Sequence, residues 1–188
     1  MKSLRFALLA VLMSLSSLVF AQSEAQKTVA PSKSDAEESF DQLKTLAGTW
    51  QGHVTTIPHQ DQDKGSTQVT MRVTSRGNAI VHEMKDPATP EDPTRYDHPV
   101  TMLYLDEGRL LLTHYCDAGN RPRMVARTSP DGKTLEFDFL DVAGDTQYGH
   151  MQHAVFTIID ANHHTEDWTY MLPGDKLLRG HLDLTRTK

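Results

Sequence analysis

The feature that most constrains the fold is the alternation of apolar and polar residues that begins after Gly48 and continues to the C-terminus. A period of two is typical of β-strands with one buried face, and turn sequences at short intervals are typical of antiparallel sheets. The chain is therefore predicted to be all-β over this region. We expect about ten strands, at residues 49–57, 67–75, 79–85, 100–106, 109–116, 123–128, 134–141, 149–159, 164–172 and 177–186.

Before Gly48 the apolar period is near four instead. Ser34 stands three residues before Glu37, the spacing of a capping box in which each side chain satisfies a free amide of the first helical turn. Apolar residues then follow at helical spacing, and the glycine supplies a stop. These residues, Phe40, Leu43, Leu46 and Ala47, predict a short amphipathic helix over residues 36–47.

The connections between the expected strands alternate in length. Tight turns at residues 76–78, 106–108, 129–133 and 160–163 alternate with longer connections at 58–66, 86–99, 117–122 and 142–147. Successive connections of an up-and-down meander lie at opposite ends of the sheet, so the tight turns gather at one end and the long loops at the other. Long loops on a rigid scaffold are where binding usually occurs. Because a meander with open edges would aggregate, we expect a single closed antiparallel up-and-down barrel with the helix closing one end. A two-sheet sandwich is the alternative.

The N-terminus has the pattern of a secretory signal. Lys2 and Arg5 precede an apolar run from Phe6 to Phe20, and Ala21 supplies the small residue before the cleavage point. We expect a signal peptide at residues 1–21, a disordered leader at 22–35 and the barrel domain at 36–188. The apolar run is too short and too rich in serine for a membrane anchor, so the mature protein is predicted to be periplasmic or secreted.

The cysteine content and the net charge exclude some covalent modifications and some classes of partner. Cys116 is the only cysteine, which excludes an internal disulfide and leaves no cysteine at the cleavage point for lipid attachment. The net charge is −6, and no cluster of Lys and Arg is present. Nucleic acid is therefore not expected as a partner.

The segment FDQLKTLAGTWQG, with Gly48-Thr49-Trp50 at the start of the first strand, resembles the entrance of calycins, the group of lipocalins and fatty-acid-binding proteins. In that group this tryptophan plugs the closed end of the barrel, so the resemblance implies a barrel with an interior ligand site. The segments LTHYCDAGNRPRM, GHMQH and EDWTY resemble an uncharacterised family of exported bacterial proteins with the same entrance.

Nitrobindins, the haem-binding branch of this group, resemble the chain in having a histidine near the C-terminus, where His181 stands here. The chain lacks their glycine-rich opening. His181 also alternates with Leu178, Leu182 and Leu184, which have the pattern of an inward face. We therefore expect His181 to face solvent, and we expect no haem or other cofactor.

The apolar face of each strand shows which polar side chains point inward. Several of these, with residues of the adjoining loop, fall toward the long-loop end, whereas Trp50 falls at the opposite end. We expect ligand-binding residues at this open mouth: His82, His114, Cys116, Asn120, Arg123, His150, Trp168 and Tyr170. The expected ligand is small and partly apolar with a polar or anionic head near Arg123, whose guanidinium can pair bidentately with a carboxylate or phosphate. Its tail would lie against Leu112, Phe137, Phe156 and Trp168.

Two other functions are compatible with the sequence. The first is a metal- or thiol-dependent enzyme, because His114 and Cys116 share a strand face and could bind zinc or copper with His82 or His150. Residues i and i+2 of a strand stand about 6.5–7 Å apart, too far for direct proton transfer between His114 and Cys116, so a thiol enzyme would pair Cys116 with His150 across the barrel. No compact metal motif is present. We therefore assign no catalytic residue and no metal ligand, and expect an inert thiol. The second is a structural or partner-binding domain.

Three further histidines are expected to be solvated. His163 and His164 fall at a tight turn at the closed end, and His153 falls on an outward face. We predict no function for them.

Overall fold

The computed structural model describes residues 32–188 except for residues 61–64, 91, 93 and 130. The predicted signal peptide and the predicted leader up to residue 31 lie outside the described residues. The elements are α1 (Asp35–Lys44), β1 (Gly48–Ile57), β2 (Ser66–Thr74), η2 (Ser75–Gly77), β3 (Ala79–Lys85), β4 (Val100–Asp106), β5 (Arg109–Tyr115), β6 (Asn120–Thr128), β7 (Thr134–Gly144), β8 (His150–Asp160), β9 (His163–Leu172) and β10 (Lys176–Arg186).

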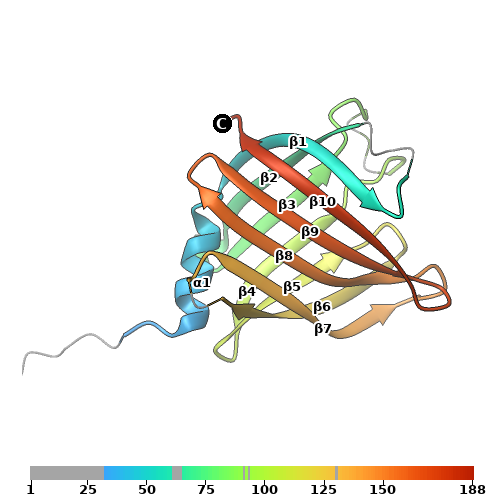
Figure 1. Ribbon diagram of the computed structural model, residues 1–188. Helices are drawn as coiled ribbons and strands as arrows, with labels where there is room; N and C mark the ends of the chain where they lie inside the picture. The colour runs from blue at the N-terminus through green and yellow to red at the C-terminus, as the bar shows by residue number, and fades with distance from the viewer. Residues whose placement is uncertain (1–31, 61–64, 91, 93, 130) are drawn as a thin grey trace, which may run out of the picture. The chain divides into compact units, whose positions relative to one another are not determined.

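The ten strands form one closed antiparallel barrel (Figure 1). Each strand pairs with its neighbours in the chain, and β1 closes the barrel by pairing with β10 from Trp50↔Arg186 to Ile57↔Arg179. This arrangement leaves no unpaired sheet edge, which is how small antiparallel barrels avoid aggregation through their edges. The predicted up-and-down barrel is confirmed, and the sandwich alternative is wrong.

The helix begins with the predicted capping box. Glu37 donates its backbone N–H to Ser34 Oγ at 3.3 Å, and Ser34 donates its own N–H to the Glu37 carboxylate at 2.8 Å. Asp35 is thus the first helical residue instead of the last residue of a leader. The helix ends at Lys44, before the predicted end at residue 47, because Thr45 donates its N–H to Gln42 O and tightens the last turn.

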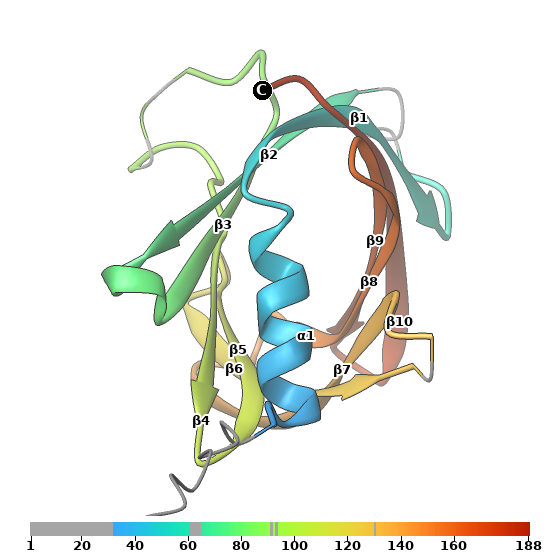
Figure 2. The same ribbon diagram turned by 90° about the vertical axis from the view of Figure 1, so that its left-hand side faces the viewer.

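Helix α1 crosses one end of the barrel (Figure 2). Phe40, Leu43 and Leu46 are buried in the same apolar cluster as Trp50, which donates its indole N–H to Leu46 O at 2.8 Å. The β8–β9 turn lies at this end, because Arg186 donates both to Ala161 O of that turn and to the backbone oxygens of Thr45 and Ala47, which follow the helix. The predicted closed end, with Trp50 beneath the helix, is confirmed.

The apolar core fills the half of the barrel nearest the helix. Phe137 and Phe156 meet edge to face with ring centroids 5.8 Å apart, and Phe156 meets Trp168 at 5.7 Å. Such aromatic pairs add to the free energy gained from burial. Among the described residues, no helix has the length and apolar character needed to cross a bilayer.

Candidate functional site

A cavity of about 450 Å³ lies at the long-loop end of the barrel. Its lining is mostly apolar and comes from strands on several sides of the barrel and from the loop before β4. The lining residues are Val54, Thr56, Met84, Asp97, Pro99, His114, Cys116, Asp117, Met151, Trp168, Tyr170, Leu172, Leu178, Gly180 and Leu182. Small-molecule sites in proteins are concave, mostly apolar and of this size.

Four of the eight predicted residues line this cavity: His114, Cys116, Trp168 and Tyr170. His82 is buried beneath it, with its ring centroid 5.7 Å from that of Trp168. The inward faces predicted for β3, β5 and β9 are therefore confirmed. Of the residues expected to contact a ligand tail, Leu112, Phe137 and Phe156 are fully buried in the core and do not line the cavity.

Arg123 does not reach the cavity. Strand β6 begins at Asn120, before the predicted start at residue 123, so Arg123 lies within the strand and on the face opposite the buried Met124. Its guanidinium forms a bidentate ion pair with Asp141 of β7 on the outer surface. The expected placement of a ligand head near Arg123 is thus corrected.

His150 and Asn120 also lie outside the cavity. A bulge between Met151 and His153 shifts the alternation of β8 by one residue, so Met151 lines the cavity and the His150 ring lies against Phe139, 4.9 Å between centroids. Asn120 is buried, and its side-chain amide donates at 2.8 Å to the backbone oxygens of Asp145 and Gly149. Asn120 therefore holds the β7–β8 loop.

The His114 imidazole is the most deeply buried polar group of the cavity lining, with 3% of the residue exposed. Its Nδ1 lies 2.9 Å from Thr101 Oγ1 on the neighbouring strand β4. Burial, with a smaller contribution from His82, lowers the pKa of His114 to about 4. The ring is therefore neutral at pH 7.

Cys116 and Tyr170 are protonated at neutral pH. Burial raises the pKa of the Cys116 thiol, and the charges of Asp97 and Asp117 add to this effect. Burial and the neighbouring Cys116 raise the pKa of Tyr170 to about 12. Because the thiolate is the nucleophilic form of cysteine, this environment favours the less reactive form of Cys116.

Acidic side chains lie at the rim of the cavity. Both Asp97 and Asp117 expose surface to solvent. Surrounding atoms nevertheless remove part of the hydration of the Asp97 carboxylate, and this partial desolvation, with the charge of Asp117, raises the pKa of Asp97. Neither carboxylate forms an ion pair with a Lys or Arg of the described residues, and no Lys or Arg lines this cavity. The rim therefore carries negative charge.

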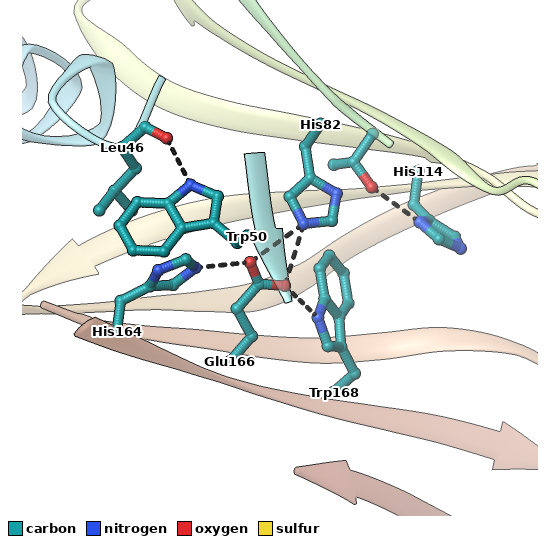
Figure 3. A network of polar contacts seen from close by, with 8 residues as sticks. Leu46, Trp50, His82, His114, His164, Glu166 and Trp168 are labelled. Carbon is teal, nitrogen blue, oxygen red and sulfur yellow. Dashed lines mark hydrogen bonds and ion pairs between the residues drawn. The ribbon is translucent and has the colours of Figure 1, made fainter. Parts of the chain in front are cut away.

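The floor of the cavity rests on a buried carboxylate, that of Glu166 (Figure 3). His82 Nε2 lies 3.0 Å from Glu166 Oε2, His164 Nε2 lies 3.0 Å from Oε1, and Trp168 donates its indole N–H to Oε2 at 3.0 Å. Burial alone would raise the pKa of Glu166, but His82 and His164 hold the pKa well below its usual range. Glu166 is thus ionised and orients the Trp168 ring that lines the cavity.

The prediction that His164 is solvated is wrong. His164 is completely buried, and its ring packs edge-on against Trp50 with centroids 4.2 Å apart. Strand β9 starts at His163, so His164 continues the inward series of Glu166 and Trp168. The i, i+2 spacing of His164, Glu166 and Trp168 indicates this inward face, but the turn residues before His164 gave it the pattern of a turn. His163 is half-buried and bonds to Asp183 on the outer surface.

Among the described residues, one group of three side chains has the spacing of a metal site, and it is remote from the cavity. Glu136, Asp138 and His153 offer ligand atoms within 4.8 Å of one another on β7 and β8. Arg127 already pairs with both carboxylates. His153 is on the outer surface, as predicted. His181 is also exposed and bonds to Asp167 at 2.7 Å, which confirms its predicted outward position.

Solved structures with a similar fold are known, whereas no protein-family model and no curated protein matches the chain. Rv2717c from M. tuberculosis is 13% identical, and the similarity covers 80% of this chain and 98% of that chain with a TM-score of 0.52. A protein of unknown function from the DUF3598 family of Nostoc punctiforme is 10% identical, with 77% of this chain covered and a TM-score of 0.51. The chain spans about half of that protein, 49%. At these identities the similarity shows the fold alone, a barrel consistent with the calycin-like entrance.

Proposed function

We propose that this protein binds a small, largely apolar molecule inside the open half of its barrel. The observation that carries this proposal is the cavity of about 450 Å³, whose walls include Val54, Met84 and Leu178. Removing an apolar molecule from water into such a cavity is favourable in proportion to the area buried.

Because Arg123 lies outside the cavity, an anionic head is no longer expected on the ligand. That guanidinium is paired with Asp141 on the outer surface, and the charged residues that line the cavity are the rim acids Asp97 and Asp117. An anionic head at the mouth would be repelled by these carboxylates. The proposal therefore keeps the apolar body and a polar group but omits the negative charge.

The thiol-dependent alternative receives no support from the site, because burial and the rim acids keep Cys116 protonated. A purely structural role would need no cavity in the barrel interior. We further propose that binding takes place in the periplasm or outside the cell, on the basis of the signal-peptide pattern at residues 1–21.

Native mass spectrometry of the protein purified from the cells that make it tests this function. We expect an additional mass that organic solvent releases, or that appears after incubation with an organic extract of the same cells. Protein that carries no bound mass and gains none from the extract would contradict the proposal.

A further inference from the structure

We propose that His114 selects the chemistry of the bound molecule by donating a hydrogen bond from Nε2 to an uncharged acceptor oxygen, such as that of a ketone, an ester or an ether, at the buried end of the ligand. This inference rests on the proposed function, since it assumes that the cavity is the binding site.

The position of the imidazole supports this role. His114 lines the cavity although only 3% of the residue is exposed. Its Nδ1 is occupied by Thr101, and within the described part of the chain Nε2 has no hydrogen-bond partner. Figure 3 shows the His114 ring apart from the Glu166 network. The Nε2 atom of His114 is thus available for a hydrogen bond to a molecule bound in the cavity.

The Thr101 hydroxyl determines which nitrogen carries the proton. Thr101 is 1% exposed, and Nδ1 of His114 is the one partner of its hydroxyl within the described residues. A buried hydroxyl proton without an acceptor costs free energy, so the hydroxyl donates to Nδ1. A neutral imidazole has one N–H, which therefore lies on Nε2 and points to an acceptor.

The surroundings favour an uncharged acceptor over an anion. The pKa of His114 is lowered to about 4, so the ring does not supply a positive charge at pH 7. Asp97 and Asp117 add negative charge at the entrance. An anion would lose its hydration without gaining a counter-charge, whereas a ketone or ester oxygen loses less.

The same geometry discriminates against pure hydrocarbons. A hydrocarbon in the cavity would cover Nε2–H and leave it without a partner, and sites that bury such a group reject ligands that lack the matching atom. The apolar walls, including Val54, Leu178 and Leu182, accept the body of either molecule. His114 is therefore a specificity-determining residue.

Two matched probes, 2-undecanone and undecane, test this inference by competition against the fluorescent probe N-phenyl-1-naphthylamine. In the full chain, we expect His114→Leu to weaken binding of 2-undecanone by about fivefold or more, the effect of one buried hydrogen bond. Binding of undecane should be unchanged or tighter. Decanoate should bind more weakly than 2-undecanone to the wild-type protein.

Each other outcome has a distinct meaning. Equal effects of His114→Leu on both probes, or no effect on 2-undecanone, would overturn the role of His114 while leaving the binding function intact. If the wild-type protein binds neither probe and not the fluorescent reporter, the proposed function itself fails.

Thr101→Val provides a second variant that keeps the imidazole in place. ¹⁵N NMR of histidine-labelled protein should show protonated Nε2 and bare Nδ1 for His114 in the wild type, with a shift of the Nε2–H signal on adding 2-undecanone. We expect Thr101→Val to raise the fraction of ring protonated on Nδ1 and to reduce the preference for 2-undecanone. A wild-type ring already protonated on Nδ1 would overturn the inference.

Discussion

At the residue scale, a single carboxylate determines how the floor of the cavity is built. Glu166 accepts hydrogen bonds from Trp168 and from two histidines, all within the barrel. A buried charge is tolerated only when its partners replace water, so removing this one group leaves three donors without an acceptor.

Glu166→Leu is therefore expected to lower the free energy of unfolding by about 3–5 kcal/mol, the cost of breaking a buried ion pair. Asp167→Asn on the same strand is the control, because the exposed Asp167–His181 pair should contribute less than about 1 kcal/mol. Urea unfolding at pH 7 measures both. Similar losses in the two variants would contradict the role of Glu166.

His114 gives the stability a specific pH dependence. Its folded pKa is about 4, against 6.5 for the ordinary group, so between these values the unfolded chain binds a proton that the folded protein does not. Stability must then fall as the pH falls through this window, by about 2 kcal/mol at pH 5 from this group. Urea unfolding at pH 7.5 and pH 5 measures this loss of free energy of unfolding, which should be smaller by that amount in His114→Leu than in the wild type. An equal loss in both proteins would exclude this pKa.

Cys116 should react slowly with iodoacetamide because its pKa is raised. At pH 7.5 we expect alkylation of the folded protein to be at least about tenfold slower than in urea, with no effect of a chelator. Fast alkylation, or alkylation that a chelator accelerates, would restore the thiol or metal hypotheses.

At the scale of the element, strand alternation predicts the inward faces wherever the strand is regular. His82, His114 and Trp168 were placed correctly on this basis. His150 was misplaced because the bulge beside Met151 shifts the phase of β8, and a single sequence gives no sign of an extra residue between paired strands. Arg123 was misplaced because polar residues at the start of β6 have the pattern of a loop.

Two glycines on the inner faces of β1 and β10 differ in the space around them. A Cβ at Gly52 would lie 1.7 Å from the backbone oxygen of Asp183, whereas at Gly180 its nearest neighbour is Val54 Cγ2 at 3.9 Å. Gly52→Ala should therefore destabilise the protein by about 2 kcal/mol or more, because the β1–β10 ladder must shift. Gly180→Ala should be neutral or stabilising by up to about 1 kcal/mol. Thermal unfolding compares the two, and equal effects would refute this difference in packing.

At the scale of the whole molecule, the barrel is divided into a filled half and a hollow half. The filled half contains Trp50, Phe137 and Phe156 under α1, and the hollow half lies toward the long loops. The sequence predicts which end is which from the turn lengths. It does not predict the cavity, because interior volume depends on how ten strands tilt and on which side chains meet across the barrel.

The central claim is that the barrel has a ligand site in its interior. The binding of N-phenyl-1-naphthylamine to a variant with a smaller cavity tests it most directly. Gly180 and its neighbours Leu178 and Leu182 on the same strand face line the cavity, so Gly180→Leu places a large side chain in the cavity and removes part of its volume. Thr185→Leu adds the same residue to the exposed face of β10. We predict that the wild-type protein and Thr185→Leu bind the probe alike and that Gly180→Leu binds it at least about tenfold more weakly. Equal binding by Gly180→Leu and wild type, with both proteins folded, would contradict a ligand site inside the barrel.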